Sequence, residues 1–184
     1  TNAVTLGASP SGGLTKTGAG TLTLACANTF AGAVAVEGGT LKVAADGALP
    51  AKAPVSVAPG ATLDLNGRAL AATALGTTGG AVVNGTLTLP SALAVDLAEA
   101  KRGNCPTFAG GAFAFPEGAT LTLAHADVRD ARDRFYTLFK VTGAGTLTGT
   151  PTLVAADDLA PWTLVNTGRE LRLAFPAGSV LILR

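Results

Sequence analysis

The chain has 184 residues, with 13 Lys and Arg against 12 Asp and Glu, which leaves a net charge of +1. This balance argues against a nucleic-acid partner, because binding to a phosphate backbone needs a basic surface. Gly, Thr, Asn and Pro interrupt every apolar run before it reaches the roughly 20 residues of a membrane-spanning helix. Met is absent even at position 1, so we expect a mature chain that has lost a leader, or a fragment of something longer.

A short phrase recurs along the chain, in which Leu or Val alternates with Thr or another polar or small residue. Its copies begin at positions 20, 39, 61, 85, 119 and 145. Alternation with a period of two predicts β-strands that turn one face toward a core. The residues expected to point inward are Leu22, Leu24, Leu41, Val43, Leu63, Leu65, Leu87, Leu89, Leu121 and Leu123.

Two architectures fit short strands with frequent turns. Asn-Gly pairs at 66–67 and 84–85 favour hairpins, and so an antiparallel β-sandwich. A parallel β-helix instead stacks similar coils of about 20 residues. Recurrence of nearly the same phrase favours the β-helix, because stacked coils bury like residues above like residues. The first hundred residues are then expected to form about five coils, and the wider gap before the fifth copy marks an insertion or the end of the regular stack.

A longer pattern covers residues 12–50, GGLTKTGAGTLTLACANTFAGAVAVEGGTLKVAADGALP. It joins a GGLTKTGAGTLTL opening, an Asn-Thr-Phe step at 28–30 and a GGTLKV strand followed by a turn that ends in GALP at 47–50. The pattern resembles the autotransporter-associated β-strand repeat, also called the passenger-associated transport repeat. Residues 134–184 are similar to the tails of large secreted bacterial proteins that carry such repeats. The resemblance implies a right-handed parallel β-helix in the passenger region of a secreted or cell-surface bacterial protein, without catalysis of its own.

The composition changes near residue 103. Eight of the nine aromatic residues lie at or after Phe108. We therefore expect β-helix coils over 1–103 and a β-rich cap over 104–184 that continues the solenoid, since an uncovered end coil would expose its core and unpaired backbone groups. The wider core of this cap is expected to contain Phe113, Phe115, Phe135, Phe139, Trp162 and Phe175.

Two segments of this region are ambiguous. Residues 91–104 contain helix-forming Ala, Leu and Glu, but the alternation in LAVDL favours a strand through Leu97 followed by a turn. Residues 125–135, HADVRDARDRF, form the best helix candidate, with Asp127 as a cap.

The cysteines and the histidine offer little chemistry. Cys26 and Cys105 could form one disulfide in an oxidising compartment, or remain separate thiols. His125 lacks the spacing to either cysteine that a zinc site needs, and no motif of a serine or cysteine hydrolase surrounds it. We expect no metal and no cofactor.

Carboxylates and aromatic residues are the remaining candidates. An acid pair of the kind that glycosidases use could only come from Asp64 near Arg68, from Asp96 near Lys101, or from Asp127, Asp130 and Asp133. Single charges on outward strand faces are usually just hydrated, so no enzyme activity is expected. Trp162 and Tyr136 could stack on sugar rings if exposed, or belong to the C-terminal core.

The sequence therefore predicts a non-catalytic structural or adhesive module, secreted or on the bacterial cell surface. Its expected partners are further copies of itself or neighbouring domains of a larger surface protein, and surface glycans are a further option. End strands such as residues 2–7, NAVTLG, could join copies into a fibre. The alternative is a carbohydrate-binding or glycan-cleaving accessory domain.

Overall fold

The computed structural model describes residues 4–6, 12–76, 80–96, 108–124, 135–154 and 163–174. The regular structure in these ranges is all β. The strands are β1 (Val4–Leu6), β2 (Leu14–Lys16), β3 (Thr21–Leu24), β4 (Val34–Val36), β5 (Thr40–Val43), β6 (Lys52–Val57), β7 (Thr62–Asp64), β8 (Ala69–Leu75), β9 (Ala81–Thr88), β10 (Ala92–Asp96), β11 (Phe108–Ala114), β12 (Thr120–Ala124), β13 (Phe135–Val141), β14 (Leu147–Thr148), β15 (Thr152–Val154), β16 (Thr163–Asn166) and β17 (Glu170–Ala174).

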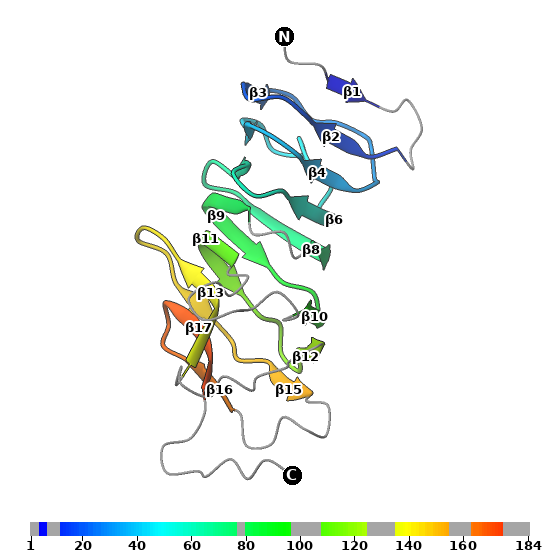
Figure 1. Ribbon diagram of the computed structural model, residues 1–184. Coiled ribbons are helices and arrows are strands. Elements are labelled where there is room, and N and C mark those ends of the chain that lie inside the picture. Colours follow the sequence, from blue (N-terminus) through cyan, green and yellow to red (C-terminus); the bar gives the residue numbers. More distant parts are fainter. Residues whose placement is uncertain are drawn as a thin grey trace.

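The strands stack as coils along one axis. The longest path through the large sheet is β1-β2-β4-β6-β8-β9-β11-β13-β17-β16, with β3, β5 and β7 forming a second column that joins it at β9. A separate parallel sheet has the order β10-β12-β15. Figure 1 shows the resulting elongated stack, in which β1 and β16 lie at opposite ends. Most neighbouring strands run parallel, which confirms the predicted parallel β-helix and not the antiparallel sandwich.

Contacts between neighbouring coils give the coil length directly. In the N-terminal half Leu14 pairs with Val34, and Val34 pairs with Val55. At the same spacing, the side chain of Asn28 bonds to Ala48, at a sequence separation of 20. In the small sheet Leu93 pairs with Leu121, and the neighbouring bond from Thr120 to Ser91 has a separation of 29. The predicted coil length is therefore confirmed for the first half, and the coils lengthen after β9.

The recurring phrase does not stay in one column. Its first three copies stack in register as β3, β5 and β7, as expected. The next strand in that column is Ala81–Val83 at the start of β9, whereas the fourth copy lies on Ala69–Ala71 of β8. The expectation that each copy covers the previous one is therefore wrong from the fourth copy onward. The reason is that β9 runs through a corner at which the coil before it turns, so a single strand covers both β7 and β8.

The ten residues expected to point inward all contact the core. Nine of them are buried, and Leu22 is partly buried. Leu22 pairs with Leu41, and Leu41 pairs with Leu63. Leu41 and Leu63 are fully buried. The difference follows from position, because β3 has a strand of the column on one side only.

The C-terminal coils have an aromatic core, as predicted for the residues that the structure describes. The ring of Phe139 lies 5.3 Å from those of Phe113 and Phe115, in edge-to-face geometry with both. Leu138 and Phe139 are both fully buried although they are adjacent, because the pairing of β13 with β17 shifts register between Thr137 and Phe139. A bulge of this kind turns two successive side chains to the same face.

Antiparallel strands close the two ends of the stack. At the N-terminal end β1 pairs with β2, so part of the predicted docking segment 2–7 folds back on its own chain. At the other end β17 pairs with β13, and β16 pairs with β17. The predicted strand before Leu97 is present as β10. The predicted helix at 125–135 lies outside the described residues except for Phe135, which begins β13.

Candidate functional site

Polar side chains gather at the turns between strands, where backbone carbonyls have no partner in a ladder. Lys16 lies on the inward face of β2 and is fully buried. Its ammonium donates to the carbonyl oxygens of Thr17 at 2.8 Å, Gly18 at 2.7 Å and Gly38 at 3.0 Å. Three acceptors satisfy all three N–H donors of the ammonium, which is what allows a charge to lie inside a protein. Gly38 belongs to the next coil, so Lys16 joins the first coil to the second.

Arg68 joins two coils in the same way. Its guanidinium donates from Nη1 to the carbonyl oxygen of Val43 at 3.1 Å and from Nη2 to that of Ala44 at 3.0 Å, both in the preceding coil. Its Nε donates to Oδ1 of Asp46 at 2.8 Å. The Asp46 side chain is 95% exposed, so this ion pair adds little to stability compared with the bonds to the carbonyls.

Asp64 is bound to other groups at the same corner. Its Oδ1 accepts the backbone N–H of Asn66 at 2.9 Å and Nδ2 of Asn84 at 3.1 Å. Both asparagines have positive φ angles, 49° and 53°: Asn66 turns the chain between β7 and β8, and Asn84 lies at the corner within β9. The carboxylate therefore fixes a turn, and Arg68, its predicted partner, pairs with Asp46.

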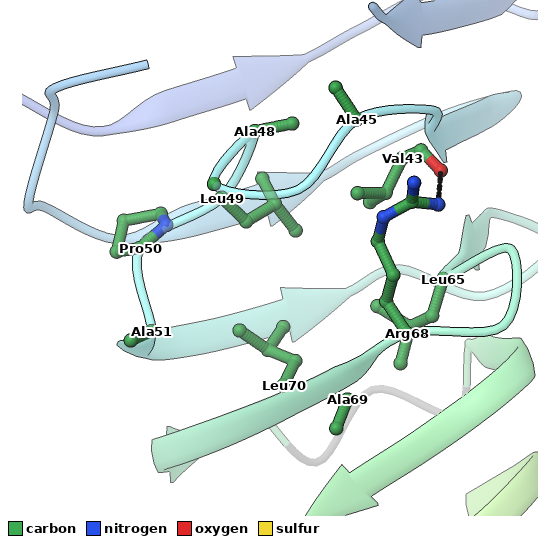
Figure 2. Close-up of a pocket in the computed structure, with 11 residues that line it drawn as sticks. Val43, Ala45, Ala48, Leu49, Pro50, Ala51, Leu65, Arg68, Ala69 and Leu70 are labelled. Atoms are coloured by element: carbon green, nitrogen blue, oxygen red, sulfur yellow. Dashed lines mark hydrogen bonds between the residues drawn. The ribbon is translucent and has the colours of Figure 1, made fainter. Parts of the chain in front are cut away.

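A small cavity lies beside Arg68. It has a volume of about 250 Å³ and is lined by Val43, Ala45, Gly47, Ala48, Leu49, Pro50, Ala51, Leu65, Arg68, Ala69 and Leu70. Figure 2 shows the guanidinium beside Val43 at one end of the cavity, and Pro50 and Ala51 at the other end. The wall is apolar, and the one charged group in it is already bound to backbone carbonyls.

A second hollow of about 510 Å³ follows one corner across three successive coils. It is lined by Val83, Asn84, Gly85, Thr86, Gly111, Ala112, Thr142, Gly143, Ala144 and Gly145. A Cβ on Gly145 would lie 1.8 Å from the carbonyl oxygen of Gly111. The coils thus approach so closely here that the corner tolerates no side chain at Gly145, and the hollow is floored by backbone.

One part of the chain matches a known family, and it is the pair of coils joined by the buried Lys16. Residues 14–43 match the family model of the passenger-associated transport repeat. This match confirms the resemblance predicted from the sequence, and the repeat comprises β2 to β5. It supports a structural module in the passenger region of a surface protein. Comparison with curated proteins and with solved structures gives no match.

The passenger-associated transport repeat contains one of the predicted site residues. Cys26 follows β3 and is exposed. Its proposed partner Cys105 lies outside the described residues, so a disulfide between them stays a prediction. No helix in the described part is long and apolar enough to cross a membrane.

The other predicted site residues lie wholly or partly outside the described residues. Tyr136 lies in β13, but its side chain is outside the description, and Trp162 lies outside it altogether. Asp96 ends β10, while its possible partner is not described. The remaining candidates outside the described ranges are Lys101, His125, Asp127, Asp130 and Asp133. Within those ranges no three His, Cys, Asp or Glu side chains form a group that could hold a metal ion.

Sequence reasoning missed two cations that bind turns, Lys16 and Arg169. Lys16 occupies an inward position of the repeat, directly before a glycine-rich turn. A charged residue at an inward position is the sequence signal that could have predicted its bonds to the turn. Arg169 donates to the carbonyl oxygens of Gly143 at 2.5 Å and Gly145 at 3.4 Å. The contacts of Arg169 were harder to predict from the sequence, because the C-terminal coils have no uniform length that would point to its partners.

Proposed function

We propose that this chain is a non-catalytic structural module of a secreted or cell-surface bacterial protein, in which the β-helix acts as a rigid spacer. The observation that supports this most strongly is the use made of the polar side chains. Asp64, Arg68 and Lys16 all bind backbone groups at turns, and three of those groups, on Gly38, Val43 and Ala44, belong to a neighbouring coil. Side chains used in this way hold the stack together and are not free to react with a substrate.

The core supports the same role. One hydrophobic cluster extends from Leu14 in β2 to Leu173 in β17. Because each coil buries its inward residues against the coils on either side, the stack resists bending and its coils depend on one another. A module of this kind holds whatever is attached to its two ends at a fixed distance from each other.

The role includes contact at the ends of the stack, either with a surface to which the protein adheres or with further copies. The glycan-binding alternative depends on Trp162 and Tyr136 and is a separate proposal. A glycan array with Trp162→Ala as control tests it, because a signal that the substitution removes would support it and the absence of any signal would end it.

Limited proteolysis combined with urea unfolding tests the spacer. We expect proteinase K to leave a resistant fragment that contains β2 to β17, and fluorescence and circular dichroism to report one coincident transition. Separate transitions for the two halves, or rapid cleavage between coils, would contradict a rigid spacer. Hydrolysis of a polysaccharide that disappears in Asp64→Asn but persists in the matched variant Asp46→Asn would contradict a non-catalytic role.

A further inference from the structure

The strand β16 is the last strand of the large sheet, and within the described chain it pairs with β17 alone. It carries Val165, whose exposed fraction is 43%. Val154 in the neighbouring β15 is 45% exposed, and these two are the large apolar residues that the described structure leaves exposed. Both residues therefore lie at the C-terminal end of the stack, on the last strand of the small sheet and the last strand of the large sheet.

The strand is also held firmly in place. Asn166 donates from Nδ2 to the carbonyl oxygen of Gly149 at 2.7 Å, and its Oδ1 accepts the N–H of Gly168 at 2.7 Å. Leu164 packs against the core. A strand fixed on one side loses little conformational freedom when another strand adds to it.

The pairing with β17 shows which backbone groups of β16 point outward. The N–H of Thr167 donates to the carbonyl oxygen of Glu170 at 2.9 Å, so these two residues form a hydrogen-bonded pair. Hydrogen-bonded and non-hydrogen-bonded pairs alternate in an antiparallel ladder, which gives Val165 its bonds to β17. Leu164 and Asn166 then direct their N–H and C=O groups away from β17, toward the outer edge.

Nothing in the sequence of this edge opposes pairing. Proteins usually protect an edge strand with a charge, a proline or a bulge. The strand Thr163–Asn166 reads Thr-Leu-Val-Asn and pairs with β17 without a register shift. Its composition therefore suits the addition of another strand of the same character.

We propose that a second copy of this chain docks on β16, antiparallel and related by a twofold axis that passes beside Val165. This inference rests on the end contacts of the proposed structural role and names the surface. An antiparallel partner continues the order β13-β17-β16, whose two steps are already antiparallel. Two identical strands around a twofold axis must run antiparallel, which matches these two steps.

The register follows from the outward groups. Leu164 of each copy faces Asn166 of the other, and the two pairs exchange four backbone hydrogen bonds. Val165 then faces Val165 of the second copy as a non-hydrogen-bonded pair, in which Cα atoms lie about 4.5 Å apart. Because the contact is the same patch on both copies it closes on itself, and it gives a dimer of double length and not a fibre.

Cysteine trapping at the axis tests this geometry. In a background with Cys26→Ser and Cys105→Ser, Val165→Cys is expected to form an intermolecular disulfide about tenfold or more faster than Thr122→Cys. Thr122 is the matched control, because it is exposed and occupies the position of Val154 one coil earlier, between two strands. Equal rates for the two variants would overturn the proposed register.

Light scattering after gel filtration tests the dimer itself. The unmodified chain is expected to show the mass of two copies, and Val165→Glu the mass of one, because two carboxylates would face each other at the axis. Val165 is an exposed position, so the fold accepts this carboxylate. Thr122→Glu is expected to remain dimeric. A monomer at every concentration, or an open series of larger species, would overturn the proposal, while the spacer role is tested separately by the unfolding of Val165→Glu.

Discussion

The two halves of the stack bury their cores by different means. In the N-terminal half the coils are short and regular, and aliphatic side chains of similar size cover one another, as Leu41 covers Leu63. In the C-terminal half a longer coil separates Leu93 from its partner Leu121, and three phenylalanine rings pack together in the core. The comparison teaches that a constant coil length lets like residues repeat, whereas the core of the longer coils is packed with larger side chains in edge-to-face contact.

The difference extends to the polar contacts. In the short coils, the side chains that join neighbouring coils reach residues one coil length away: Lys16 reaches Gly38, Asn28 reaches Ala48, and Arg68 reaches Asp46, at sequence separations of 22, 20 and 22. In the long coils Thr142 reaches Gly110 at a separation of 32. Side chains separated by one coil length are thus neighbours in a β-helix, as side chains separated by one turn are neighbours in an α-helix.

The largest expected effect is in the aromatic half. Phe139→Ala removes a fully buried ring that contacts two others, and we expect it to lower the free energy of unfolding by about 3–5 kcal/mol. Urea unfolding measures this. A loss below about 1 kcal/mol would show that the long coils collapse around the gap, and that the rings are not what closes them.

The aliphatic column gives the matching experiment. Leu63→Ala is expected to cost about 2–5 kcal/mol, because Leu63 is fully buried between strands on both sides. Leu22→Ala in the same column is expected to cost less, since Leu22 is already partly exposed. Both values come from urea unfolding. If the two substitutions cost the same, burial by neighbouring coils does not control the column.

The buried ammonium comes next. Lys16→Met keeps a long side chain but leaves three carbonyl oxygens without their donor, with an expected loss of about 1–3 kcal/mol by thermal or urea unfolding. Lys42→Met is the control within the same repeat, because Lys42 lies on the outward face of β5, where a change within about 0.5 kcal/mol is expected. Equal effects would mean that Lys16 does not join the coils.

The smallest effects are expected at Arg68. Arg68→Met removes two bonds to the preceding coil, with an expected loss of about 1 kcal/mol. Asp46→Asn should leave the unfolding midpoint almost unchanged, because its carboxylate is in water. A larger loss of unfolding free energy in Asp46→Asn than in Arg68→Met would show that the ion pair, and not the bonds to the carbonyls, stabilises this contact between coils.

Much of the fold could be predicted from the sequence, because alternation and burial are local properties. The ten inward residues and the parallel stacking follow from the recurring phrase. The position of the fourth copy could not be predicted, since β9 covers β7 and β8 together and the phrase does not record which column a strand joins.

At the corner around Asp64, closeness in sequence predicts the wrong partners. Asp64 and Arg68 are four positions apart, but they do not pair with each other. Their partners lie one coil away: Asn84 follows Asp64 at a separation of 20, and Asp46 precedes Arg68 at a separation of 22. The spacing of the recurring phrase predicts the coil length, and residues one coil length apart include both contacts. The residues after Phe108 gave no such spacing.

The complete burial of Lys16 has a consequence for amine chemistry. Lys42, Lys52 and Lys140 are at least partly exposed, and an acylating reagent can reach them in the folded protein. The amine of Lys16 is enclosed by carbonyl oxygens and becomes reactive only when the first two coils separate. Acylation of this single residue therefore records, molecule by molecule, whether the N-terminal end of the stack has ever opened.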